Sequence, residues 1–347
     1  MRIIATLPRA EGRGGDMRRR DFIVGAASLA MAARAAAQPV TVKRLALVNV
    51  SSPSQAQMSE DRSPYYKTFL GELRRLGRVE GPELIVDRYS KEQLVSGPAA
   101  LAAQVVASKP DVINLIDPSP LFFVRETKSI PIVTISNDPV AAGFAQSMAR
   151  PGGNITGVSV DTGPSIHGKR IALLRELFPG MAKLACITPG AAWDGPTGAA
   201  VRSAADTAGV QVSSVSVDYP GNPTTYRNAI VQAARDGADA IMVIDTPDAL
   251  NHRVAISEAL AEVRIPAIQA FAAAVDAGGL MAYSFDLREL TKRMAATVDA
   301  ILRGANPAEI PFYQVSKFEL SINLKAAEAL GLTVPPTMLA VAEKVVE

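Results

Sequence analysis

Short apolar runs alternate with longer mixed segments along the chain from residue 43 onward. The runs at 112–116 and 130–135 are rich in Ile and Val and are too short for helices, so they predict strands buried on both faces. Polar turn residues follow these two runs directly, namely Asp117, Ser119, Asn137 and Asp138. Ligands of a parallel α/β sheet bind beyond the carboxyl ends of its strands, so these turns are the first candidate binding loops.

A second copy of this unit occurs later in the chain. Residues 111–117, DVINLID, correspond to residues 239–245, DAIMVID, and each copy is followed by a turn with Pro and later by a strand that begins Ile-Pro. Strands that alternate with helices predict a parallel, doubly wound sheet, and the repeated unit predicts two such α/β lobes. Chance similarity between short hydrophobic strands is the alternative explanation.

The same alternation predicts the other elements. We expect further strands at 45–50, 83–89, 184–188, 211–217, 240–245, 265–271, 278–286 and 315–323. We expect helices at 64–76, 98–108, 165–177, 197–208, 224–235, 248–263, 287–302 and 324–330, and a last one opening at residues 335–336. Pro in the first turn or Gly after the last turn marks several of these helix boundaries.

The first 38 residues have the pattern of an export signal rather than of a folded segment. Residues 18–20 are three arginines, residues 22–33 are uncharged and largely apolar, and residues 35–37 are alanines before Gln38. The Arg-Arg-x-Phe pattern predicts the twin-arginine route, with a general secretory signal as the alternative. Met17 directly precedes the arginines, so the true start codon could lie there. Without a Cys near the cleavage site, we expect no lipid anchor.

Composition narrows the class of protein. A hydrophobic content of 48% supports a full core, and a net charge of +2, which includes the basic leader, argues against nucleic acid as a partner. The single Cys186 cannot form an intrachain disulfide, which a large exported domain does not need. No apolar run approaches the ~20 residues of a membrane span. From the export signal we expect a periplasmic protein, and we also expect a monomer.

Two loops stand out by composition. Residues 51–63 form a long polar loop after the first predicted strand, and such loops are more often functional than idle. The only tryptophan, Trp193, lies in a Gly- and Pro-rich loop after the predicted strand at 184–188. It could form an aromatic wall for a ligand, or it could cover the edge of its own core.

Several motifs give the chain from residue 43 to its end a family resemblance. They are DPVAAG at 138–143, ARPGGNITG at 149–157, GGLMAY at 278–283, KFEL at 317–320, INLK at 322–325 and ALGLTVPP at 329–336. The chain resembles bacterial ABC-transporter substrate-binding proteins of the family that includes tryptophan- and tyrosine-binding periplasmic proteins. The resemblance implies a type I periplasmic-binding fold, in which two α/β lobes joined by three hinge crossings close on a small ligand.

The crossings would fall near 157–160, 281–284 and 313–316. Lobe 1 would then comprise 43–157 and 284–313, and lobe 2 would comprise 158–283 and 314–347. On this fold the ligand-binding candidates of lobe 1 are Ser51, Ser52, Asp117, Ser119, Asn137 and Asp138. Those of lobe 2 are Asp161, Trp193, Asp245, Thr246, Asp248 and Phe271.

For an amino-acid ligand, a carboxylate such as Asp138 would hold the ammonium group. Helix N-termini and hydroxyl groups would hold the ligand carboxylate, and Trp193 or Phe271 would pack its side chain. Each Asp has a structural alternative, because Asp before a helix is a favoured N-cap and Asp-Pro is typical of turns.

Catalysis has little support. The only histidines, His167 and His252, fit structural or surface positions, and neither a serine-nucleophile elbow nor Cys/His metal spacing is present. We expect no enzyme activity, no cofactor and no metal. The expected function is a periplasmic solute receptor of an ABC importer, with a small solute and a membrane permease as partners. The alternatives are a sensory protein that signals to a membrane receptor or kinase and, less favoured, an exported α/β enzyme.

The sequence does not name the solute. Aromatic or branched amino acids lead by resemblance, and amides, nucleosides and aromatic acids stay open.

Overall fold

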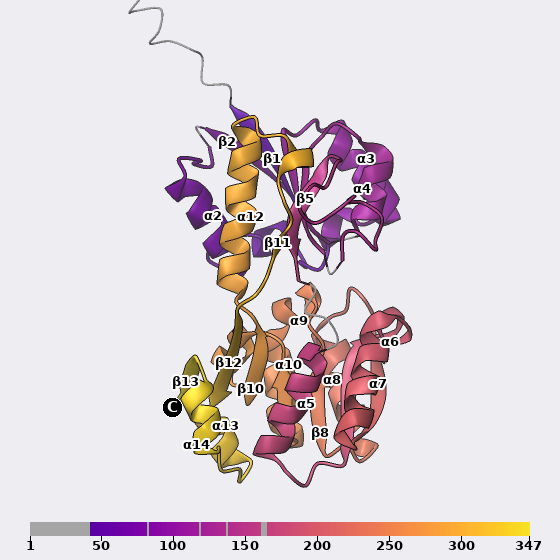
Figure 1. Cartoon of the computed structure of the whole chain (residues 1–347), viewed down its shortest axis with the longest axis vertical. Helices are drawn as coiled ribbons and strands as arrows, with labels where there is room; N and C mark the ends of the chain where they lie inside the picture. The colour runs from indigo at the N-terminus through magenta and orange to yellow at the C-terminus, as the bar shows by residue number, and fades with distance from the viewer. Residues whose placement is uncertain (1–41, 82, 118, 137, 161–164) are drawn as a thin grey trace, which may run out of the picture. The chain divides into compact units, whose positions relative to one another are not determined.

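The computed structural model describes residues 42–81, 83–117, 119–136, 138–160 and 165–347, with only the backbone described at Asp117 and Ser165. The predicted export signal at 1–38 and two predicted site residues, Asn137 and Asp161, lie outside the described residues. Strands and helices alternate along the described chain (Figure 1), which confirms the predicted α/β class.

The first sheet has six strands in the order β11-β5-β4-β3-β1-β2, and all of its pairs are parallel. Its strands are β1 (Lys43–Asn49), β2 (Leu84–Tyr89), β3 (Val112–Asp117), β4 (Ile132–Ser136), β5 (Ile155–Ser159) and β11 (Tyr313–Gln314). The chain runs outward from β1 to β2 and then returns to β3. The order therefore reverses between β1 and β3, where doubly wound sheets place their ligand crevice.

The second sheet has seven strands in the order β13-β12-β10-β9-β8-β6-β7. Its strands are β6 (Lys183–Pro189), β7 (Gln211–Val217), β8 (Ala240–Val243), β9 (Ala267–Gln269), β10 (Met281–Phe285), β12 (Phe318–Asn323) and β13 (Lys344–Val346). The order again reverses, here between β6 and β8. All pairs are parallel except β10 with β12, which is antiparallel.

Helices cover both faces of each sheet. Around the first sheet, α2 (Pro64–Arg75) and α12 (Leu287–Leu302) pack side by side on one face, and α3 (Gly97–Ala107) and α4 (Pro120–Glu126) on the other (Figure 1). Around the second sheet, one core contains α5 (Ser165–Leu177), α7 (Pro196–Ala208), α13 (Leu324–Ala329) and α14 (Pro336–Val341). The opposite core contains α8 (Pro223–Arg235) and α10 (Arg253–Val263).

Alternation along the strands explains this layering. In β1, Leu45 and Leu47 belong to the core with α2 and α12, whereas Ala46 and Val48 belong to the core with α3 and α4. The strand is therefore apolar throughout, as expected for a parallel strand covered on both faces. Short helices complete the chain: α6 (Gly190–Asp194), α9 (Pro247–Asn251), α11 (Ala272–Asp276), and the 3₁₀ turns η1 (Gln55–Gln57), η2 (Lys91–Gln93) and η3 (Pro307–Glu309).

We call the first sheet with its four helices the first half, and the second sheet with its helices the second half. The chain passes from one sheet to the other after β5, after β10 and after β11, because β6, α12 and β12 respectively belong to the opposite half. β10 runs toward the first half and β12 returns from it, which is why these two strands pair antiparallel. That the halves act as lobes on hinges stays a prediction.

Several predicted elements differ from the structure. The predicted helix at 248–263 is two helices, α9 and α10, which meet at His252, where the backbone leaves helical geometry with φ −97° and ψ 12°. Trp193, predicted in a loop, lies in the short helix α6. The strand β13 and the helix α11 were not predicted, because three and five residues are too few to show a period.

Candidate functional site

A cavity of about 270 Å³ lies between the two halves at the carboxyl ends of their strands. This volume is just below the range of about 300–1,000 Å³ that is usual for small-molecule sites. The first half lines it with Asn49, Ser63, Tyr65, Tyr66, Ile116, Ile135, Ser136, Val160 and Leu287. The second half lines it with Asp245, Thr246, Pro247, Leu250, Asn251, Phe271 and Phe285.

The cavity wall is mainly apolar and contains four aromatic residues. Phe271 and Phe285 meet edge to face with centroids 5.8 Å apart, and Tyr65 and Tyr66 meet edge to face at 5.1 Å. The tyrosine hydroxyls have partners in the first half: Tyr65 donates to Asn114 Oδ1 at 3.3 Å, and Tyr66 accepts from Asn49 Nδ2 at 3.3 Å. Burial raises the pKa of both phenols, so they are neutral.

Asp245 is the one acidic side chain in the cavity wall of the described chain. It follows β8, and its Oδ1 accepts a hydrogen bond of 2.8 Å from Arg170 Nη1. The Arg170 side chain is fully buried, whereas that of Asp245 is 24% exposed. Burial alone would raise the pKa of Asp245, but the charge and hydrogen bond of Arg170 outweigh it and lower that pKa. Asp245 is therefore ionised, and the buried Arg170 is its positively charged partner.

Arg170 is fixed by more than this ion pair. It extends from α5, and its Nε donates to the carbonyl of Tyr283 on β10 at 2.9 Å. Its Nη2 is buried and has no hydrogen-bond partner among the described residues. A fully buried guanidinium is costly unless paired, so the side chain ties α5, β8 and β10 together around Asp245.

The opposite wall presents a helix N-terminus. α2 begins with Pro64, and Ser63 at its N-cap makes no side-chain capping hydrogen bond. Backbone N–H groups in the first turn of a helix have no partner within the helix and carry part of its positive dipole. Ser63, Tyr65 and Tyr66 all line the cavity, so this helix end can bind an anionic group there. The cavity thus has an acidic side and an anion-binding side, each from a different half.

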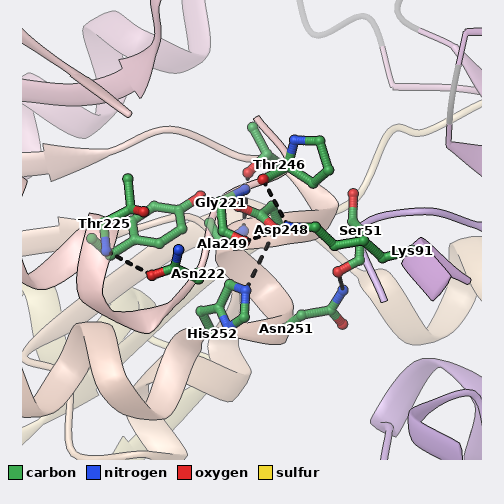
Figure 2. A network of polar contacts seen from close by, with 12 residues as sticks. Ser51, Lys91, Gly221, Asn222, Thr225, Thr246, Asp248, Ala249, Asn251 and His252 are labelled. Carbon is green, nitrogen blue, oxygen red and sulfur yellow. Dashed lines mark hydrogen bonds and ion pairs between the residues drawn. The ribbon is translucent and has the colours of Figure 1, made fainter. Parts of the chain in front are cut away.

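A network of polar contacts adjoins the cavity (Figure 2). Buried Asp248 accepts hydrogen bonds at Oδ2 from the Gly221 N–H and from the Tyr226 hydroxyl, both at 3.0 Å. Its Oδ1 lies 3.6 Å from His252 Nε2. Burial lowers the pKa of His252, against the opposing charge of Asp248 and with the help of the Lys91 charge.

The same network contains polar contacts that join the two halves. Lys91 donates to the carbonyls of Pro220 at 3.0 Å and Gly221 at 3.2 Å. Asn251 Nδ2 donates to the carbonyl of Ser51 at 2.9 Å, and the Ser51 hydroxyl lies 3.0 Å from that of Tyr219.

The structure brings six of the predicted site residues to this region. Asp245, Thr246 and Phe271 line the cavity, and Thr246 also caps α9 through a hydrogen bond from the Ala249 N–H at 3.0 Å. Asp248 and Ser51 belong to the adjoining network, and the carbonyl of Ser52 accepts the Lys91 N–H at 2.9 Å.

Three predicted residues have local structural partners instead. Asp138 is exposed, and its Oδ1 accepts from the N–H groups of Val140 and Ala141, both at 2.9 Å. Ser119 is exposed and caps α4. Trp193 packs against the core of the second half, with the Arg202 guanidinium 4.8 Å above its ring. None of the three lines the cavity, so their ligand roles stay predictions.

The remaining predicted residues cannot be placed in this way. The side chain of Asp117 and all of Asn137 and Asp161 lie outside the described residues. Sequence reasoning missed the aromatic pair Tyr65–Tyr66 and the buried Arg170. Pro64, which marked a helix start after a long polar loop, was the signal that could have pointed to the tyrosines.

The other reactive side chains stay apart from the cavity wall. Cys186 is buried in β6, and burial raises the pKa of its thiol to about 12. Within the described residues, no group of His, Cys, Asp and Glu side chains is arranged to hold a metal ion. No helix in the described part of the chain combines the length and apolar character needed to cross a membrane.

Comparison with known proteins gives a consistent result. The sequence pattern of the family described as "ABC transporter substrate binding protein" matches residues 62–346. A tyrosine-binding protein of Clostridioides difficile strain R20291 is 25% identical over 273 residues, which are 77% of this chain and 76% of the relative.

Two solved structures share the fold. A conserved domain protein from Vibrio cholerae matches with a TM-score of 0.72 at 22% identity, over 88% of this chain and 100% of its own. An ABC domain in complex with L-Trp from Streptococcus pneumonia matches with a TM-score of 0.72 at 23% identity, over 88% of this chain and 99% of its own. These likenesses confirm the predicted type I periplasmic-binding architecture.

Proposed function

Because the chain belongs to the ABC transporter substrate-binding protein family, we propose that it captures an α-amino acid with an aromatic or branched side chain between its two halves. The halves act as the two lobes of a clamp, joined at the three chain passages after β5, β10 and β11. The loaded protein delivers its solute to the permease of an ABC importer. The predicted export signal supports a periplasmic location.

One observation carries this proposal. The cavity has an ionised carboxylate, Asp245, on the second half and the uncapped N-terminus of α2 on the first half. An amino acid carries an ammonium group and a carboxylate on one carbon. Its ammonium pairs with Asp245 and its carboxylate with the Tyr65 and Tyr66 N–H groups and the Ser63 hydroxyl.

This division of charges links binding to closure. A ligand shifts a conformational equilibrium only by its differential affinity for the two states. A zwitterion that contacts Asp245 on one half and the α2 N-terminus on the other gains both interactions only when the halves are together. The closed form is therefore favoured by solutes that carry both charges.

The apolar wall selects the side chain of the solute. Phe271, Phe285 and Leu250 of the second half belong to the same core cluster as the residues around α2 and α12 of the first half. An aromatic or branched side chain in the cavity would extend this core and remain dry. A charged side chain would lose its hydration there without gaining a partner.

The experiment is a thermal-shift screen of the L-amino acids, followed by calorimetry with the best ligand on matched variants. A ligand at 100 times its dissociation constant stabilises the fold by about 2.7 kcal/mol. We expect Asp245→Asn to weaken binding at least tenfold, or about 1.4 kcal/mol, and Asp138→Asn to leave it within about twofold. Should Asp138→Asn alone weaken binding, Asp138 and not Asp245 holds the ammonium.

A ligand analogue controls for misfolding, because Asp245→Asn leaves Arg170 without its carboxylate. The deaminated analogue of the best ligand keeps the carboxylate and the side chain but lacks the ammonium group. It should bind wild type and Asp245→Asn alike. Loss of analogue binding in the variant would show that the cavity itself has collapsed, and Asp245→Glu then serves as the test. Absence of binding by any amino acid to wild type would overturn the proposed solute class.

A further inference from the structure

We propose that Lys91 and the turn at 219–221 form a latch across the mouth of the cleft, which sets how fast the bound solute leaves. The inference rests on the proposed function, since a latch acts only if the halves open and close. It assigns a role to residues that do not line the cavity. Asp248 is the positioning residue of this latch.

Strand order places the latch. In the first sheet the chain passages lie at the β11–β5 end, and η2 with Lys91 follows β2 at the opposite end. In the second sheet two of the three passages, those after β10 and before β12, lie near one end, and the 219–221 turn follows β7 at the opposite end. The cavity residues of β3, β4, β8 and β9 lie between. Contacts at the edge farthest from the passages close the mouth of such a cleft.

The accepting side of the latch is rigid. The Gly221 N–H is held by the buried Asp248 carboxylate at 3.0 Å, and the next residue, Asn222, caps α8 through the Thr225 N–H at 3.0 Å (Figure 2). A Cβ at Gly221 would lie 3.1 Å from Asp248 Oδ2 and 2.9 Å from the carbonyl of Asp218, so the turn is tightly packed. The Pro220 and Gly221 carbonyls are thus fixed acceptors for one ammonium group.

The buried carboxylate explains why this turn keeps its position. Asp248 is fully buried and would be costly there without partners. Gly221 and Tyr226 supply two hydrogen bonds to Oδ2, and His252 faces Oδ1. Among the described residues, the side-chain partners of Asp248 all lie in the second half, so it acts on the latch through the turn that it holds.

The donating side is also fixed. Lys91 begins η2, whose N-cap Ser90 forms a reciprocal capping box with Gln93. The Lys91 N–H donates to the carbonyl of Ser52 at 2.9 Å, and the neighbouring Ser51 meets Asn251 and Tyr219 of the second half. Lys91 is exposed, so water can reach the hydrogen bonds that its ammonium group makes across the mouth. Such a contact can open without disrupting either core.

Lys91→Met tests the latch, because it keeps the length of the side chain and removes its donors. We expect the dissociation constant of the best amino acid to rise about fivefold, with nearly all of the change in the dissociation rate constant measured by stopped-flow competition. Lys91→Arg should recover most of the loss. Lys128→Met removes an exposed charge elsewhere on the first half and should leave both constants unchanged.

Tyr226→Phe tests the positioning role, since it removes one hydrogen bond to Asp248 and keeps the ring. We expect it to raise the dissociation rate constant while the association rate constant stays at the wild-type value. If Lys91→Met and Tyr226→Phe release solute at the wild-type rate, the latch is refuted and the proposed function stands. If wild type binds no amino acid, the proposed function fails first, which distinguishes the two failures.

Discussion

At the scale of single residues, the second half contains a buried charge system whose parts depend on one another. Arg170 keeps Asp245 ionised, and His167 on the same helix lies close enough for both charges to act on it. His167 is itself buried, and no residue in the described part of the chain makes a hydrogen bond with its Nδ1. Protonation of His167 would be unfavourable both because the ring is buried and because Arg170 carries a positive charge nearby. His167 is therefore neutral in the folded protein.

This arrangement predicts a loss of stability in acid. Burial, with help from Arg170 and against Asp245, lowers the pKa of His167 from 6.5 to about 4. The unfolded chain therefore binds a proton between these pH values that the folded chain does not. The contribution of neutral His167 to the free energy of unfolding is fully present above pH 6.5. It falls by roughly 3 kcal/mol as the pH drops to 4. Urea unfolding at about pH 7 and pH 4 measures it.

His167→Gln is the matched variant for this prediction. Its free energy of unfolding should fall less between the two pH values than that of wild type, by roughly 2–3 kcal/mol. His252 is present in both proteins, so it contributes equally to the pH dependence of their free energies of unfolding. Equal falls in the two proteins would show that His167 carries no part of the acid sensitivity.

Sequence reasoning found the residues that follow strands and missed those that depend on tertiary packing. The place of Asp245, Thr246 and Phe271 on the cavity wall could be predicted, because strand ends in α/β sheets face the ligand crevice. Arg170 could not, because nothing local distinguishes a buried arginine on a helix from an exposed one. Asp138 also follows a strand end, but it is exposed and its carboxylate accepts hydrogen bonds from the turn that comes after it.

At the scale of elements, the pairing of β4 with β5 depends on one glycine. Gly157 in β5 has φ +149°, and a Cβ there would lie 1.9 Å from the carbonyl oxygen of Thr134 in β4. The strands approach too closely for any side chain, and the conformation is one that only glycine adopts at low cost. β5 is also the strand from which the chain first passes to the second half, so its position bears on the whole cleft.

We therefore expect Gly157→Ala to destabilise the protein by about 3 kcal/mol or more, from strain and overpacking together. Gly153→Ala is the control, because a Cβ at Gly153 meets nothing within 4 Å. Urea unfolding of the two variants measures the difference. A Gly157→Ala protein within about 1 kcal/mol of the control would mean that the close approach of β4 and β5 is relaxed in solution.

Two long helices were predicted closely, and features that depend on how the chain crosses between the halves were not. The helices at 165–177 and 287–302 have the predicted bounds. The antiparallel pairing of β10 with β12 has no local signal, because it arises from the direction in which the chain returns to the second half. The division of 248–263 at His252 was also missed, because the apolar period continues through the break.

At the scale of the whole described chain, the chain passages, the cavity and the Lys91 contact lie at different places across the two sheets. The passages after β10 and β11 lie near one end of both sheets, the cavity in the middle, and the Lys91 contact at the other end. A hinge, a binding site and a closing contact in this order make an economical clamp, because a small rotation at the passages gives a large opening at the mouth. On the proposed function, solute charge favours closure, and the proposed latch then delays release.

The most direct test of this account is a crystal structure of the chain with its best amino acid. We predict the ligand in the cavity, with its ammonium group within hydrogen-bond distance of Asp245 and its carboxylate at the Tyr65 and Tyr66 N–H groups. A ligand that lies outside this cavity, or that makes all of its polar contacts with one half, would contradict the account.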